Sequence, residues 1–176
     1  MQPAEEIAPG LRRWSARHDE WNERVASLAL DTGDGLVLID PIDPPRSLGA
    51  PAHVLLTVYW HARSAAALGS ARIWAPKRSE RALRSREVAV TDAFQAGDAL
   101  PGGIRSFQTP RAAEVAYWLP AQQALVVGDV LLGAGTHDDL RRMLRPLLEL
   151  PLERVLVSHG EPVLAGGRDA LAEVLA

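Results

Sequence analysis

The sequence predicts an α/β fold, because short apolar strands alternate with amphipathic helices in both halves of the chain. Three observations support this class: an apolar hairpin at 25–39, a strand and helix succession at 53–86, and a second half in which several strands are followed by helices. The chain has 176 residues, of which 47% are hydrophobic, so it can bury a sizeable core without disulfides. We therefore expect one domain that spans residues 1–176.

The first half begins with the hairpin. Val25 to Leu30 is an apolar run, Asp31 to Gly35 supplies a turn, and residues 36–39 form the second arm. Pro41 ends that arm, since proline cannot donate to a strand ladder. The elements expected in this half are strands at 25–30, 36–39, 53–58 and 72–75, helices near 64–68 and 79–86, and an extended piece at 87–91.

The second half is richer in strands. Its short apolar segments are separated by proline, glycine or an Ala-Gln-Gln turn. A helix follows them, because Leu140, Leu144 and Leu147 recur on one stripe while arginines fill other positions. The elements expected here are strands at 104–108, 115–119, 125–127 and 155–157 and helices at 138–150 and 168–175.

The composition excludes several classes of function. The chain has no cysteine, so thiolate metal sites and disulfides are excluded, and a reducing cytoplasm fits. Its 19 Lys plus Arg against 22 Asp plus Glu give a net charge of -3, so we expect no nucleic-acid partner. No apolar stretch approaches the roughly 18 residues that cross a bilayer, and we expect a cytoplasmic protein without membrane contact. A homodimer stays open, because two-fold assemblies are common.

Four segments, in this order, resemble a known family. They are Leu-Val-Leu-Ile-Asp-Pro at 36–41, Leu-Leu-Thr at 55–57, Val-Val-Gly-Asp-Val-Leu-Leu-Gly at 126–133 and Val-Leu-Val-Ser-His-Gly at 155–160. Together they resemble the metallo-β-lactamase superfamily over residues 24–164. The resemblance implies an αββα sandwich, with two mixed β-sheets face to face, helices on the outer faces, and a site where strand-end loops meet. It also implies hydrolysis of an acyl or ester bond, if the chain is active.

In that family the loop after the 55–57 strand reads His-x-His-x-Asp-His and holds one or two metal ions. Here Val58 and Trp60 stand at the places of the first two histidines. Ala62 and Arg63 stand at the places of the aspartate and the third histidine. None of these four side chains ligates a metal. The resemblance therefore implies a degenerate metal site.

Asp129 and His159 are the family ligands that remain. The next expected histidine, after Thr109-Pro110, is missing, and Arg111 stands in a shortened segment there. His61 is the one imidazole in the first loop, one position away from the expected second histidine. Because strand period does not fix directions in a turn, the sequence leaves the orientation of His61 open.

Three functions are consistent with these residues. In the first, which we expect, no cofactor binds and the protein is metal-independent or inactive. Asp129 then orients His159 as a general base, and Arg63 and Arg111 bind a small anionic molecule. Trp60 lies in the same loop and serves as a stacking surface or a packing residue. A direct ion pair between Arg63 and Asp129 is the purely structural form of this hypothesis.

The second hypothesis keeps one metal ion. His61, Asp129 and His159 would form a set of two histidines and one carboxylate, which suits a single zinc or iron ion if His61 points inward. The positive charge of Arg63 opposes such a site. The third hypothesis is a non-enzymatic module that binds a small molecule or a protein at the same edge, since a fold alone does not decide function.

Overall fold

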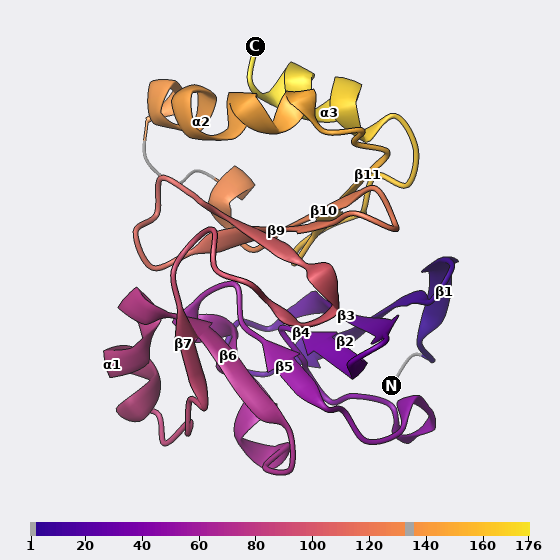
Figure 1. Cartoon of the computed structure of the whole chain (residues 1–176), viewed down its shortest axis with the longest axis vertical. Coiled ribbons are helices and arrows are strands. Elements are labelled where there is room, and N and C mark those ends of the chain that lie inside the picture. Colours follow the sequence, from indigo (N-terminus) through magenta and orange to yellow (C-terminus); the bar gives the residue numbers. More distant parts are fainter. Residues whose placement is uncertain (1–2, 133–135) are drawn as a thin grey trace.

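The computed structural model describes residues 3–132 and 136–176, and within them two β-sheets lie face to face (Figure 1). The first sheet has seven strands in the order β1-β2-β3-β4-β5-β6-β7, and the second has four in the order β11-β10-β9-β8. The strands of the first sheet are β1 Glu5–Ala8, β2 Leu11–His18, β3 Glu23–Thr32, β4 Gly35–Ile39, β5 His53–Leu55, β6 Arg72–Pro76 and β7 Asp92–Phe94.

The seven-stranded sheet is mixed. Strands β1 to β4 pair antiparallel, and β4 to β7 pair parallel. The expected hairpin is confirmed as β3 and β4, with Leu30 opposite Val37. Its turn requires Gly35, because φ is +103° there and an added Cβ would lie 2.8 Å from the Cβ of Ala52.

The four-stranded sheet is mixed as well. Strands β8, β9 and β10 pair antiparallel, and β11 joins β10 in parallel. The backbone N–H of Ala26 donates to the carbonyl of Ser158 at 2.8 Å, and Val25 forms a β-bridge with His159. The two sheets therefore meet beside β3 and β11. The strands of this sheet are β8 Arg105–Gln108, β9 Val115–Leu119, β10 Ala124–Val127 and β11 Arg154–Val157.

Helices cover the outer faces of both sheets. Val37 belongs to the apolar cluster between the sheets, whereas its neighbour Leu38 faces the outer cluster that contains Leu83 of α1 (Glu80–Arg84). Helices α2 (His137–Leu144) and α3 (Gly167–Val174) close the other outer face (Figure 1). This alternation is what a strand buried on both faces requires. The expected αββα sandwich is confirmed.

Three expected elements differ in the structure. The helix that begins at His137 ends at Leu144, and a 3-10 turn continues over Arg145–Glu149, because Pro146 lacks the N–H that an α-helix needs. The expected extended piece at 87–91 is wrong: Glu87 has φ of +58°, and the strand that pairs with β6 is Asp92–Phe94. The helix near 64–68 is a single 3-10 turn, Ala65–Ala67.

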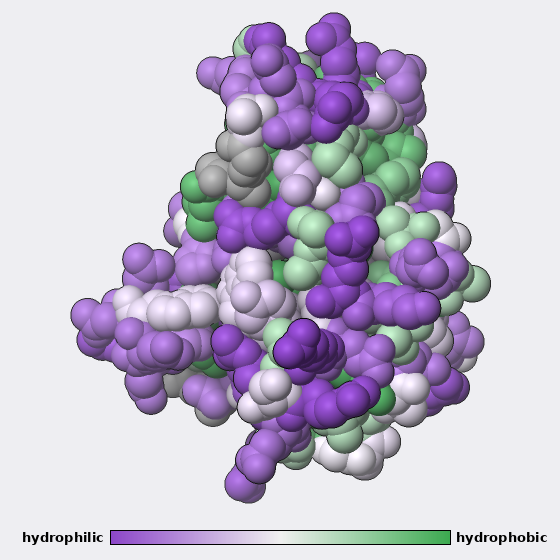
Figure 2. Space-filling view, turned by 90° about the vertical axis from the view of Figure 1, so that its left-hand side faces the viewer, coloured by the Kyte–Doolittle hydropathy of each residue, from purple (hydrophilic) through white to green (hydrophobic). Residues whose placement is uncertain are grey.

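The surface is predominantly hydrophilic on the face that Figure 2 presents, where hydrophobic residues form small groups between polar ones. Among the described residues, the exposed large apolar side chains are Leu132, Leu164 and Val174. No helix within the described ranges has the length and apolar character that a membrane span requires. The residues that remain to be explained are the buried polar ones at the strand ends.

Candidate metal centre

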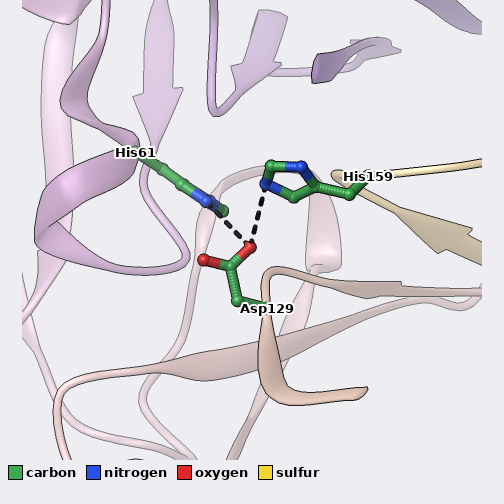
Figure 3. A group of neighbouring side chains, drawn as sticks. All are labelled: His61, Asp129 and His159. Carbon is green, nitrogen blue, oxygen red and sulfur yellow. Dashed lines mark ion pairs between the residues drawn. The ribbon is translucent and has the colours of Figure 1, made fainter. Parts of the chain in front are cut away.

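Three loops from the two sheets converge on one cluster of side chains. His61 lies in a short 3-10 turn, Tyr59–Ala62, shortly after β5. Asp129 follows β10, and His159 follows β11. Figure 3 shows the two imidazoles directed at the carboxylate of Asp129. The structure thus settles the orientation of His61, which faces the cluster.

The three side chains present their ligand atoms to one another. Nε2 of His61 lies 3.2 Å from Oδ1 of Asp129, and Nε2 of His159 lies 3.4 Å from the same oxygen. His61 is fully buried. Nevertheless, neither Nε2 of His61 nor Oδ1 of Asp129 has a hydrogen-bond partner among the described residues. The two atoms face each other as an ion pair, and an ion held between them and His159 would satisfy both.

The second nitrogen of His61 is held by a buried carboxylate. Nδ1 lies 2.9 Å from Oδ2 of Asp40, and the hydroxyl of Thr57 donates to the same oxygen at 2.5 Å. The backbone N–H of Thr57 donates to the other oxygen of Asp40 at 2.8 Å. When Nδ1–H of His61 donates to Asp40, Nε2 carries the lone pair that a metal ligand needs.

His159 is held in a similar way. Its Nδ1 lies 3.2 Å from Oε2 of Glu23, at the start of β3, while its Nε2 faces Asp129. The ring of Trp21 lies 6.0 Å from that of His159 and 6.3 Å from that of His61. His18 stacks on Trp21 at 4.0 Å. The β2–β3 hairpin therefore covers the histidine side of the cluster with aromatic rings.

Trp60 contacts the other oxygen of the central carboxylate. Its indole N–H donates to Oδ2 of Asp129 at 2.7 Å. The guanidinium of Arg111 lies 5.3 Å from the centre of the Trp60 ring, and its Nε lies 3.4 Å from Oε2 of Glu114. The predicted residues Trp60 and Arg111 are therefore at the site.

Glu114 holds the backbone of the Asp129 loop. Its Oε1 accepts hydrogen bonds from the backbone N–H of Asp129 at 2.7 Å and from that of Val130 at 2.9 Å. Burial raises the pKa of Glu114 to about 7, although these two N–H groups lower it. An added Cβ on Gly128 would lie 2.8 Å from both Oε1 of Glu114 and Oγ1 of Thr57. The motif glycine is thus the residue that lets the strands approach.

Arg63 corrects one expectation from the sequence. Its guanidinium donates to the carbonyl oxygens of Ala26 and Asp40, both at 3.0 Å, and to the hydroxyl of Ser158 at 2.6 Å. The ion pair with Asp129 that the sequence suggests is not among the contacts of Arg63 in the described parts of the chain. Arg63 lies at a bend with φ of +39°. From there its side chain reaches the backbone carbonyls at the sheet junction and not the carboxylate of Asp129.

The charges at the cluster stabilise each other. Burial lowers the pKa of His61, but the carboxylates of Asp40 and Asp129 outweigh that effect and raise it above its usual value. Burial likewise opposes ionisation of Asp129, yet His159 and His61 hold the pKa of that carboxyl far below its usual range. Asp129 is therefore an anion that faces two imidazoles.

The geometry fits one metal ion. Ligand atoms at zinc-like bond lengths around a tetrahedral ion lie about 3.4 Å apart. Oδ1 of Asp129 lies 3.2 and 3.4 Å from the two histidine nitrogens, and all three ligand atoms lie within 4.8 Å of one another. Carboxylates on Nδ1 of both histidines are the usual outer partners of metal-binding imidazoles. Three protein ligands also leave a further position open, as catalytic sites require.

Sequence reasoning missed Asp40, Thr57 and Glu23 as partners of the histidines. Asp40 appears in the sequence as the residue that ends a strand before proline, and that position at a strand end is the signal that it belongs to the site edge. Glu23 gives no signal, because its contact with His159 spans 136 positions of sequence. Long-range pairing of this kind follows only from the register of the two sheets.

Comparisons with known proteins identify the fold. No protein-family description matches the sequence, and no curated protein matches it. Solved structures do match: the chain has the metallo-β-lactamase fold. One of them is the DIM-1 metallo-β-lactamase, which aligns with a TM-score of 0.77 at 13% sequence identity, over 98% of this chain and 96% of that one.

Two further similar structures are metal-bound forms. FIM-1 from Pseudomonas aeruginosa, described in its mono-zinc form, aligns with a TM-score of 0.74 at 13% identity, over 98% of this chain and 92% of that chain. TTHA1623, described in a di-iron-bound form, aligns with a TM-score of 0.62 at 24% identity, over 89% and 96%. At these identities the likeness is one of fold.

Proposed function

We propose that this chain is a hydrolase that uses one divalent metal ion, zinc or iron, held by His61, Asp129 and His159. The observation that carries the proposal is the convergence of three ligand atoms, Nε2 of His61, Oδ1 of Asp129 and Nε2 of His159, which lie within 4.8 Å of one another in a partly buried site. The mono-zinc and di-iron forms of FIM-1 and TTHA1623 support either metal.

The metal would supply Lewis-acid chemistry, which polarises a carbonyl oxygen and lowers the pKa of water at the site. The protein's own residues prepare that position. Asp40 and Glu23 face Nδ1 of the two histidines, and when each Nδ1–H donates to its carboxylate, the neutral ring offers the lone pair of Nε2 to an ion. These two carboxylates thereby orient the ligands.

Arg111 is the candidate contact for substrate. Its side chain is 35% exposed beside Trp60, whereas the guanidinium of Arg63 is committed to groups inside the protein. An exposed guanidinium next to an aromatic ring binds a carboxylate well. We therefore propose a small anionic substrate with an ester or thioester bond.

The metal-independent hypothesis has less support. A general base needs a nitrogen that can accept a proton from the reacting group. Nδ1 of His159 faces Glu23 at 3.2 Å and Nε2 faces Asp129 at 3.4 Å, so both nitrogens are directed at carboxylates. The same arrangement suits a metal site, because a metal ion needs the carboxylate and the imidazole side by side as ligands.

The decisive experiment measures metal content and hydrolysis together. The full chain is purified without an affinity tag, loaded with Zn²⁺ or Fe²⁺, and its bound metal is counted by elemental analysis. We expect about one ion per chain, with hydrolysis of chromogenic ester and thioester substrates that chelator abolishes.

His61→Ala should lose both the ion and the hydrolysis. His18→Ala is the matched control, since His18 lies near the cluster but is outside the ligand set, and it should keep the ion. A wild-type chain that binds no metal after loading would overturn the proposal. In that case His61 is an imidazolium between Asp40 and Asp129, and the cluster is structural.

A further inference from the structure

We infer that Trp60 is a positioning residue for the metal site: its indole N–H holds one oxygen of Asp129 so that the carboxylate offers only the other to an ion. The inference rests on the proposed metal site. Trp60 stands where the family resemblance places a histidine ligand, yet its side chain still reaches the cluster, with Nε1 2.7 Å from Oδ2 of Asp129.

The hydrogen bond divides the carboxylate into two different oxygens. Oδ2 is occupied by the indole, whereas Oδ1 lies 3.2 and 3.4 Å from the two histidine nitrogens and has no hydrogen-bond partner among the described residues. A carboxylate with both oxygens free can chelate an ion or bridge two ions. With Oδ2 held by the indole, Oδ1 is the oxygen that Asp129 presents to an ion between the two histidines.

Trp60 is itself held by a closed ring of contacts. Arg111 lies over the indole, and its Nε faces Glu114 at 3.4 Å. Glu114 accepts the backbone N–H of Asp129 at 2.7 Å, and the side chain of Asp129 returns to Trp60. Three residues, Trp60, Arg111 and Glu114, thus hold Asp129 at its backbone and at its side chain. Tyr59 packs edge-on against the indole at 4.7 Å and limits its rotation.

The same ring opposes a second metal ion. An ion bridged through Oδ2 would have to displace the indole N–H from that oxygen. The guanidinium of Arg111, 5.3 Å from the centre of the Trp60 ring, adds a positive charge next to that indole. Two cations at short range in a partly buried site repel strongly. Trp60, at the position where the resemblance places a histidine ligand, therefore favours one ion over two.

The test uses Co²⁺ as the probe, since its visible spectrum reports coordination number. The full-length wild-type chain, Trp60→Phe and Trp21→Phe are titrated with Co²⁺ and then competed with a chelator. Trp60→Phe keeps an aromatic ring beside Arg111 but loses the N–H. Trp21→Phe is the matched control. Trp21 also lies beside both histidine rings, but among the described residues it makes no hydrogen bond to Asp129.

We expect the wild type and Trp21→Phe to bind one Co²⁺ with the intense spectrum of a four-coordinate ion. Trp60→Phe should bind Co²⁺ about 10–100-fold more weakly, as loss of an outer partner ordinarily does. Its spectrum should be weaker, because the released Oδ2 raises the coordination number. A wild type that binds Co²⁺, together with a Trp60→Phe variant of equal affinity and spectrum, overturns this inference alone.

Two further outcomes keep the tests separate. If wild type binds no Co²⁺, the proposed function fails and this inference fails with it. Trp60→Gln serves as a second variant, since it retains an N–H donor without the ring. Affinity closer to wild type in Trp60→Gln than in Trp60→Phe supports the positioning role, and equal losses in both overturn it in favour of simple packing.

Discussion

Arg63 ties three segments together at the level of a single side chain. Its guanidinium binds the carbonyl of Ala26 on β3, the carbonyl of Asp40 after β4 and the hydroxyl of Ser158 after β11. Burial lowers the pKa of the guanidinium, and the nearby carboxylates of Asp40 and Asp129 counter that effect. The group stays charged, since arginine is not deprotonated in proteins. Its role is to join the two sheets next to the candidate metal site.

Removal of that side chain should destabilise the fold. In Arg63→Ala, two backbone carbonyls and one hydroxyl lose their donor, and we expect the free energy of unfolding to fall by about 3–5 kcal/mol. Urea denaturation followed by circular dichroism measures the change. Arg105→Ala is the control, because Arg105 is exposed and lies only over Phe107. Equal stability of Arg63→Ala and wild type would contradict this role.

The residues of the site differ in how far sequence reveals them. The sequence identifies Asp129 and His159 by the short motifs that follow two strands. It also identifies His61 as the histidine of the first loop, but the direction of the His61 side chain depends on the turn Tyr59–Ala62. From the sequence, Arg63 is predicted to bind substrate, because its charge is visible there. The three acceptors that surround its guanidinium are not visible in the sequence. Partners of a side chain that come from distant strands are set by sheet register, which a single sequence does not display.

The strand β10 and its following loop place Asp129 with little tolerance. Gly128 is the point at which this strand passes Glu114 and Thr57, and a Cβ there would lie 2.8 Å from an oxygen of each. We predict that Gly128→Ala lowers the free energy of unfolding by about 1–3 kcal/mol, the usual cost of overpacking. The loop that carries Asp129 should shift with it.

Gly69→Ala is the control for that change, because an added Cβ at Gly69 meets no atom within 4 Å. Thermal unfolding of both variants gives the comparison, and amide hydrogen exchange at 129–132 reports the local shift. A Gly128→Ala variant as stable as Gly69→Ala, with unchanged exchange, would show that Glu114 and Thr57 can move away without loss.

At the level of elements, the sequence predicts most strands correctly and misplaces boundaries where a single residue interrupts a pattern. The hairpin β3–β4 follows from its apolar arms and turn residues. The helix after Thr136 ends early because Pro146 cannot donate, although the apolar stripe continues to Leu147. The apolar stripe indicates which residues are buried, and residues of the 3-10 turn after the helix are buried too. The spacing of apolar residues therefore predicts the buried face more reliably than it predicts the last residue of the helix.

For the whole molecule, the proposed metal site lies where the two sheets meet. His61 follows β5 of the seven-stranded sheet, whereas Asp129 and His159 follow β10 and β11 of the four-stranded sheet. An ion held by all three ligands exists only when both sheets are docked. The binding free energy of the ion is then added to the stability of the folded state.

Metal loading should therefore raise the stability of the whole fold. At a free Zn²⁺ concentration of 100 times Kd, the free energy of unfolding should rise by about 2.7 kcal/mol, and Tm by roughly 5–10 °C for a chain of this size. Differential scanning calorimetry with Zn²⁺ and then with chelator measures both directions. His61→Ala should show no rise, while His53→Ala, a histidine outside the cluster, should match wild type. An equal rise in His61→Ala would show that the ion binds without His61. The bound ion would then lie elsewhere, and the seven-stranded sheet would contribute no ligand at this edge.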